Sequence, residues 1–113
     1  MSKGDHLGEF ELHVLLALAQ LGGDAYGIRI RQDITARTGR DVAIGAVYAT
    51  LERLLRKGLV VFTLSAPLPQ PGGRARKLYT MTGAGRRALW HSTAMLGRMM
   101  AGLDLARQPR RRS

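Results

Sequence analysis

Residues 44–57 read IGAVYATLERLLRK, and this stretch decides which fold the chain can adopt. Its apolar side chains recur every three or four positions, which is the spacing of one face of an α-helix. We therefore predict a helix that packs this apolar stripe against a core. Gly58 stands where a helix commonly ends in a left-handed residue. The stripe consists of Ile44, Val47, Tyr48, Leu51, Leu54 and Leu55.

The opposite face of this helix is small at its beginning and basic at its end. Glycine and alanine let a helix approach another surface closely, and arginine side chains bind phosphates. Such a helix suits the major groove of DNA, which is about 12 Å wide. The solvated face of an ordinary core helix is the alternative, so the flanking segments must decide. The face consists of Gly45, Ala46, Ala49, Thr50, Arg53 and Arg56.

Two helices are predicted before this one. Residues 9–21, EFELHVLLALAQL, are apolar on nearly every side, which is typical of a helix with several neighbours. Asp24 is a predicted N-cap for a second helix over about residues 25–38, and Gly39 closes that helix. The short connection from there to residues 44–57 fits a helix-turn-helix.

A β-hairpin is predicted after the third helix. Residues 59–64 (LVVFTL) and 76–81 (RKLYTM) are short strand-like runs. Three prolines and a Gly-Gly pair between them favour a stiff, projecting turn. Arg74, Arg76 and Lys77 make the tip basic, which suits contact with a DNA minor groove or backbone. A solvated charge cluster is the alternative.

The last predicted element is a long helix capped by Thr82 and reaching about Ala106. At about 35 Å it is longer than a small core needs, so we predict self-association along one side of it. Trp90, Met95 and Leu96 are candidates for a ligand pocket, with packing of Trp90 on its own core as the alternative. The predicted dimer stripe is Leu89, Ser92, Leu96, Met99 and Leu103.

The charge of the chain favours a polyanionic partner. The formal net charge is +10, and residues 58–113 hold ten basic residues but a single acid, Asp104. Nucleic acid is the commonest partner for such a balance. The chain has no cysteine, its three histidines have no ligand spacing, and no phosphate-binding loop or nucleophile motif is present. We therefore expect no enzyme, cofactor or metal site, no membrane association, and a cytoplasmic location close to the nucleoid.

The third helix and its surroundings resemble a known family. Residues 45–54, GAVYATLERL, followed by Lys57-Gly58-Leu59-Val60, are similar to the recognition-helix signature of the PadR transcriptional regulators. Over about residues 8–103 the other pieces fall in the order of that family, and the chain resembles its short subfamily with one C-terminal helix. These pieces are the leucine-rich first helix, Tyr26-Gly27, Gly72-Gly73-Arg74, and Tyr79 before Thr82 and Gly85.

The resemblance implies a winged helix-turn-helix protein that dimerises through its last helix and usually represses transcription. Family members often respond to small aromatic or multidrug-like ligands. By this resemblance Tyr48, Arg53 and Arg74 match positions that contact DNA. The chain departs from the family at the start of the recognition helix, where Ala43-Ile44 replaces a common Ser-Pro, and Asp41 is the candidate cap instead.

These observations predict a mainly α protein with a small two-stranded β-wing. We expect a winged helix-turn-helix domain over residues 1–81, a C-terminal dimerisation helix over 82–106 and a disordered basic tail over 107–113. Tyr48 has two possible roles, a ring in the core or a hydroxyl on a phosphate. The predicted DNA-binding residues are Gly45, Ala46, Tyr48, Ala49, Thr50, Arg53, Arg74, Arg76 and Lys77.

The predicted function is that of a homodimeric transcriptional repressor, which binds double-stranded DNA at an inverted-repeat operator. Two-fold symmetry would place its half-sites about 34–36 Å apart. A small aromatic or drug-like ligand is the expected effector. Two alternatives remain open from the sequence: a sequence-independent nucleic-acid-binding protein, and a winged-helix module for protein–protein contact.

Overall fold

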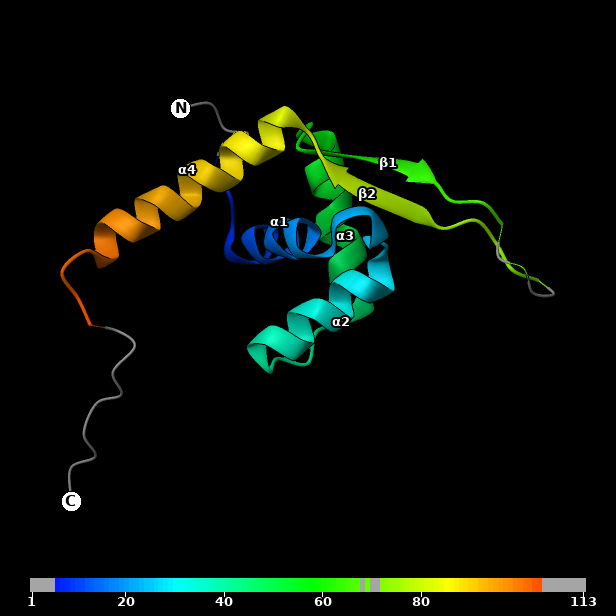
Figure 1. Cartoon of the computed structure of the whole chain (residues 1–113), viewed down its shortest axis with the longest axis horizontal. Coiled ribbons are helices and arrows are strands. Elements are labelled where there is room, and N and C mark those ends of the chain that lie inside the picture. Colours follow the sequence, from blue (N-terminus) through cyan, green and yellow to red (C-terminus); the bar gives the residue numbers. More distant parts are fainter. Residues whose placement is uncertain (1–5, 68, 70–71, 105–113) are drawn as a thin grey trace, which may run out of the picture.

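The computed structural model describes residues 6–67, 69 and 72–104. A body of three helices carries a hairpin and a fourth helix, which leave it in opposite directions (Figure 1). The elements are α1 (Glu9–Leu21), α2 (Gly27–Thr38), α3 (Ile44–Arg56), β1 (Val60–Leu64), β2 (Lys77–Met81) and α4 (Gly83–Met100), with a 3₁₀ turn at Gly22–Asp24. The predicted fold class, mainly α with a small β-wing, is confirmed. No helix in this part of the chain is long and apolar enough to cross a membrane.

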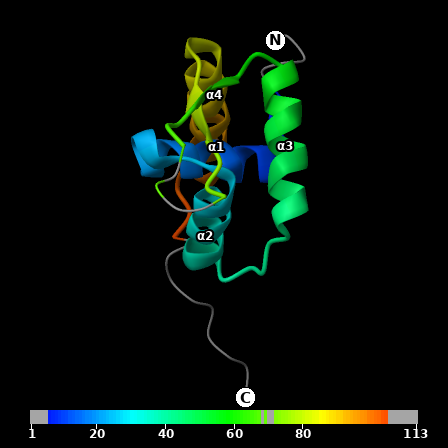
Figure 2. The ribbon, with the colours of Figure 1, turned by 90° about the vertical axis from the view of Figure 1, so that its right-hand side faces the viewer.

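Helix α1 occupies the centre of the molecule and contacts all three other helices and β2. Its apolar composition predicted several neighbours, and Val14 and Leu15 are fully buried between them. Helix α3 stands upright at one side of the body, with α1 behind it (Figure 2). The predicted stripe of α3 is buried at Val47, Leu51 and Leu54, and each such side chain contributes about 1.5–3 kcal/mol of burial free energy.

The two predicted aspartate caps are wrong. Helix α2 begins after Tyr26 and α3 begins after Ala43, and in neither case does a side chain cap the helix. Asp24 lies in the 3₁₀ turn, which delays the start of α2. The carboxylates of Asp24 and Asp41 instead form ion pairs with arginines of α2, at 3.3 and 3.7 Å. The predicted left-handed helix end at Gly39 is confirmed, with φ of 74°.

The hairpin is fixed to the body at its base. Strands β1 and β2 pair in antiparallel register, from Val60 opposite Met81 to Leu64 opposite Lys77. Tyr79 is buried, and its amide donates a hydrogen bond of 2.8 Å to the carbonyl of Ala25. Strand β2 is therefore bound to the segment that precedes α2, and this contact helps to fix the direction of the wing relative to the three-helix body.

Helix α4 begins as predicted and ends earlier. The Thr82 hydroxyl accepts a hydrogen bond from the amide of Gly85 (3.0 Å) and donates one to the carbonyl of Gly58 (2.7 Å). The helix ends at Met100 because the next residue leaves the helical region and Gly102 has φ of +84°. Leu103, predicted on the helical stripe, therefore lies beyond the helix. The predicted end at Ala106 and the predicted tail lie outside the described residues.

The close approach of α4 to the turn after α3 gives a stability prediction. A Cβ at Gly85 would collide with the backbone carbonyl of Leu59, which also accepts a hydrogen bond from the Thr82 amide. We expect Gly85→Ala to lower the free energy of unfolding by about 2–3 kcal/mol, measured by urea denaturation. Gly97→Ala is the matched control, since no atom lies within 4 Å of its Cβ. It should be neutral or stabilise by up to about 1 kcal/mol; equal effects at both glycines would refute the prediction.

Candidate nucleic-acid interface

The outermost ridge of α3 is formed by residues that the sequence spaces four, three and four positions apart. Gly45, Ala49, Glu52 and Arg56 are all exposed and point away from the buried stripe. Two shallow grooves flank this ridge, one on the side of the wing and one toward the connection between α2 and α3. The core does not cover the ridge, so α3 is free to enter a groove of a duplex.

Tyr48 lies on the wing side of the ridge. Its side chain is 45% exposed, and its ring lies over Gly27, where a Cβ would come within 2.5 Å of a ring carbon. The ring therefore rests on the start of α2 instead of entering the core, with its hydroxyl oxygen also against Gly27. The groove is lined by Tyr26, Gly27, Ile28, Tyr48, Glu52, Ala75, Arg76, Lys77 and Tyr79.

The groove on the other side combines the start of α3 with basic side chains. No side chain caps α3, and the Ala46 amide of its first turn donates to the carbonyl of Ala43 (3.1 Å). The amides of Ile44 and Gly45 are therefore available to an anion such as a phosphate. Arg40 and Arg53 line the same groove. The predicted small residues Ala46 and Ala49 also lie there and keep it open.

Thr50 is not on the outer face, which corrects the sequence prediction. It follows Val47 by three positions and precedes Leu54 by four, so it shares their buried side and is only 1% exposed. Its hydroxyl accepts a hydrogen bond of 3.0 Å from the guanidinium of Arg53. Thr50 therefore orients Arg53 and has no surface to offer DNA.

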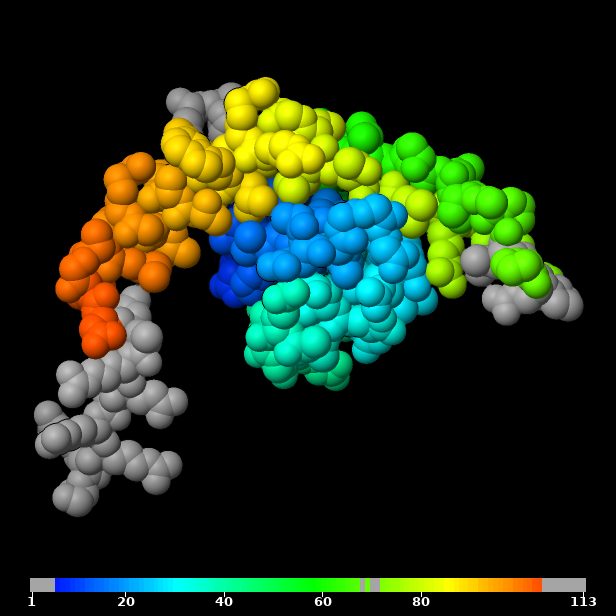
Figure 3. Space-filling model, viewed as in Figure 1, coloured from blue at the N-terminus to red at the C-terminus, as the bar shows by residue number. Residues whose placement is uncertain are grey.

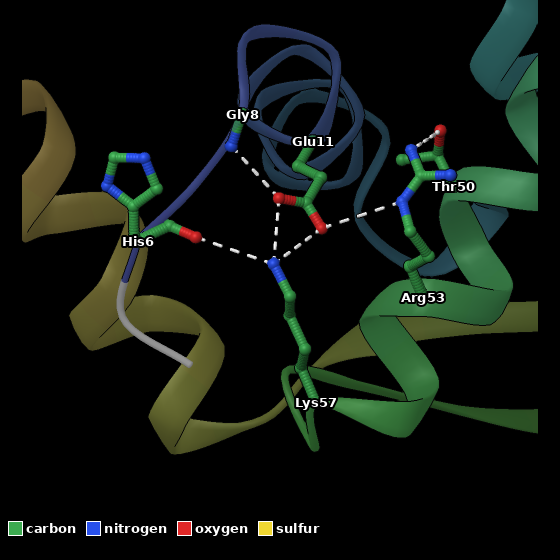
Figure 4. Close-up of polar contacts among 6 residues, drawn as sticks. All are labelled: His6, Gly8, Glu11, Thr50, Arg53 and Lys57. Carbon is green, nitrogen blue, oxygen red and sulfur yellow. Dashed lines mark hydrogen bonds and ion pairs between the residues drawn. The ribbon is translucent and has the colours of Figure 1, made fainter. Parts of the chain in front are cut away.

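A buried glutamate of α1 engages Arg53 of α3 and Lys57, the residue directly after α3 (Figure 4). The Lys57 ammonium donates to both carboxylate oxygens of Glu11, at 2.8 and 2.9 Å, and the Gly8 amide donates to the same carboxylate at 2.9 Å. The Arg53 guanidinium lies 4.0 Å from it. Burial alone would raise the pKa of Glu11, but these hydrogen bonds and positive charges outweigh it, so the pKa is lowered. Lys57 thus ties α3 to α1.

The basic residues of the wing divide into two kinds. The Arg76 guanidinium stacks over the ring of Tyr26 at 4.2 Å, and the Lys77 ammonium lies 4.6 Å from the ring of Phe62. Such cation–π contacts stabilise a side-chain position by about 0.5–1 kcal/mol. Arg74, nearer the tip, is exposed. Arg76 therefore helps to hold the wing against the body, Lys77 braces the two strands of the wing against each other, and Arg74 extends from it.

The predicted dimer residues on α4 fall into buried and exposed parts. Leu89 packs against the core and Ser92 is half-buried. Leu96 and Met99 are 52% and 79% exposed, because the second half of α4 extends past the body (Figure 3). Trp90 is 67% exposed. It does not pack on the core, so that alternative is wrong. It does not line the groove beside α4 either, and its place in a ligand pocket stays a prediction.

A groove runs along this exposed side of α4, between it and the start of α1. Two of the three predicted pocket residues, Met95 and Leu96, line it. Its volume is about 510 Å³, within the range of small-molecule sites, about 300–1,000 Å³. The complete lining is His6, Leu7, Leu12, Ser92, Met95, Leu96, Arg98 and Met99.

Glu52 is the residue of the interface that sequence reasoning missed. Its side chain is acidic, and an acid is not an expected neighbour of DNA phosphates. The signal that could have found it is its spacing, seven positions after Gly45 and three after Ala49, which places it at the centre of the outer ridge.

Comparison with known proteins identifies the family. A model of the transcriptional regulator PadR-like family matches residues 14–91, well over half of the chain. The chain is a PadR-like transcriptional regulator. It belongs to a family of transcriptional regulators, as its recognition-helix signature predicted. No protein of curated function matches this PadR-like chain in sequence.

Three solved structures show the same fold. F93 from STIV, a winged-helix DNA-binding protein, is 16% identical with a TM-score of 0.68, covering 86% of this chain and 97% of its own. A PadR-like transcriptional regulator from Bacillus cereus is 22% identical with a TM-score of 0.60, covering 82% and 92%. BpsR of Bordetella bronchiseptica, whose DNA binding is regulated by 6-hydroxynicotinic acid, is 19% identical with a TM-score of 0.62, covering 94% and 74%.

The buried carboxylate of Glu11 gives a pH-dependent prediction. Its pKa lies below the ordinary 4.5 in the folded chain, so its stabilising effect is complete above about pH 4.5 and is lost as the pH falls through the folded-state value. We expect Glu11→Gln to lower the free energy of unfolding by about 1–3 kcal/mol at pH 7, and by progressively less below pH 4.5.

Urea denaturation across this pH range measures the effect. The control is Glu9→Gln on the same helix, because the exposed pair of Glu9 with Arg40 (3.4 Å) contributes at most about 1 kcal/mol. A loss at Glu11 that stays constant down to pH 3 would show that the carboxylate charge is not what stabilises the contact.

Proposed function

We propose that this PadR-like regulator is a cytoplasmic homodimeric repressor that binds an inverted-repeat operator and is released by a small aromatic or drug-like ligand. The observation that carries the proposal is the exposed ridge of α3, small at its start and basic at its end, with the basic wing at its flank. This surface matches the width and charge of a major groove bordered by phosphates.

The DNA contacts follow from the geometry of the two grooves. The start of α3, from Gly45 to Ala49, enters the major groove because its side chains leave room for base edges. Its free amide groups, Arg40 and Arg53 hold the backbone on one side. Tyr48 presents its hydroxyl on the other side, and Arg74 carries the wing to the adjacent minor groove or backbone. Arg76 and Lys77 add charge from their positions over aromatic rings.

The second half of α4 supports the homodimer. An exposed row of leucine and methionine side chains on a helix that leaves the body is costly in water, and a second copy of α4 would cover it. A two-fold dimer of this kind presents two copies of α3, which requires an inverted repeat with half-sites about one helical turn apart. Binding across a promoter would block transcription.

The groove between α1 and α4 supports a ligand-responsive regulator. It is lined by methionines, which adapt to varied apolar shapes, and it shares Ser92, Leu96 and Met99 with the proposed dimer contact. A ligand there would change the angle of α4 and with it the spacing of the two α3 helices. Regulation of BpsR by 6-hydroxynicotinic acid gives a precedent in a similar fold. A broad screen of aromatic compounds that releases no bound DNA would count against this part of the proposal.

DNA binding is tested with the DNA upstream of the chain's own gene, by fluorescence anisotropy over a range of salt concentrations. We expect preferential binding over random DNA. Arg74→Ala should weaken binding to both, and reduce the slope of log affinity against log salt by about 1 per protomer. Arg87→Ala on α4 removes the same charge elsewhere and should change the slope little.

Two outcomes would favour other functions. Equal affinity for upstream and random DNA indicates a sequence-independent nucleic-acid-binding protein. No binding at moderate salt, together with indifference to replacement of Arg53 and Arg74, indicates a module for protein–protein contact.

The dimer is tested by sedimentation of the wild-type chain and of Leu96→Asp and Met99→Asp. Both substitutions place a charge in the proposed contact, where burial would cost several kcal/mol. We expect a dimeric wild type, monomeric variants with unchanged helix content, and loss of tight binding to the inverted repeat. Arg87→Asp, exposed on the side of α4 opposite Leu96, should remain dimeric. A wild-type monomer bound to its operator would contradict the proposal.

A further inference from the structure

Glu52 is an acid at the centre of a surface otherwise made of small and basic residues. It is the only acidic residue in α3, it is exposed, and it lies on the outer ridge between Ala49 and Arg56. On one side it faces the groove that Arg76 and Lys77 line from the wing. A carboxylate here repels the phosphates of any bound duplex, so its position needs another partner.

The chemistry of base edges identifies this partner. An ionised carboxylate is an acceptor without donors, and the donors in the major groove are the amino groups of cytosine and adenine. The adenine amino group lies beside N7, an acceptor that would repel the carboxylate. Cytosine presents its N4 amino group without such a neighbour on the same base. Cytosine is therefore the base that fits a glutamate best.

The residues around Glu52 allow its side chain to reach a base. Gly45 and Ala49 precede it on the same ridge and carry almost no side chain, so the helix can lie deep in the groove. Arg53 and Arg56 follow it, and the wing cations stand beside it. These positive groups offset the repulsion between its carboxylate and the flanking phosphates, which leaves the carboxylate free to accept a hydrogen bond from a base.

We propose that Glu52 reads a cytosine in each half-site by accepting a hydrogen bond from its N4 amino group, and so determines part of the operator sequence. The inference rests on the proposed function, because it requires sequence-specific binding in the major groove. In this arrangement Glu52 contributes to the choice of DNA sequence, while the arginines contribute affinity for the DNA backbone.

The test is selection of binding sites from a pool of random-sequence duplexes by wild type, Glu52→Gln and Glu52→Ala. Wild type should enrich cytosine at one position, repeated by symmetry in both half-sites. Glutamine pairs with the N6 and N7 groups of adenine, so Glu52→Gln should enrich adenine at that position. Glu52→Ala should show no preference there. Replacing the cytosine in one half-site should weaken wild-type binding about tenfold, and should not affect Glu52→Ala.

The charge-matched control is Asp104→Asn, which removes an exposed acid beyond α4 and should select the wild-type site. If the glutamate variants select an unchanged site and bind all sequences more tightly, Glu52 faces phosphates; this inference is then wrong while the proposed function stands. If the wild-type chain enriches no motif, both are overturned.

Discussion

The structure depends on the packing of one side of α3 against α1. Val47, Leu51 and Leu54 have no exposed surface, and together they fix the rotation of α3 about its own axis. Since side chains repeat every 3.6 residues, burying this stripe determines which residues form the outer ridge. A rotation of one position would bring Ala49 to the buried place of Thr50 and Leu51 to the exposed place of Glu52. The proposed interface with DNA is therefore set by the apolar back of the helix as much as by its front.

Charge is distributed by the same packing. The net charge of +10 suggests a uniformly basic surface, but several cations have partners within the chain. Lys57 is bound to the buried Glu11, and Arg76 and Lys77 lie over aromatic rings. These contacts fix the two ends of the recognition surface, α3 and the wing, while Arg56 and Arg74 remain exposed. Internal partners thus sort the basic residues into those that hold the surface together and those that extend from it.

The junction at the end of α3 connects the two proposed activities. Thr82 begins α4 by bonding to the carbonyls of the turn after α3, and Gly85 allows α4 to lie directly against the backbone of Leu59. A change in the direction of α4 therefore acts directly on the end of α3. This mechanical link is what a ligand beside α4 would use.

The sequence by itself determined the order of the elements, the left-handed glycines Gly39 and Gly58 and the Thr82 cap, because these depend on short-range spacing and local backbone geometry. Of the predicted stripe of α3 it determined the buried centre, Val47, Leu51 and Leu54, but not its edge, where Ile44 and Tyr48 are exposed. It also determined the family, through a signature within one helix and its turn. Only the tertiary structure decided which cations are held by other side chains. The partners of Lys57 and Arg76, which are Glu11 and Tyr26, are distant from them in sequence. The tertiary structure likewise decided that Thr50 is buried, that Trp90 is exposed and that Glu52 occupies the centre of the ridge, because the exact boundary of a buried face depends on what packs against it.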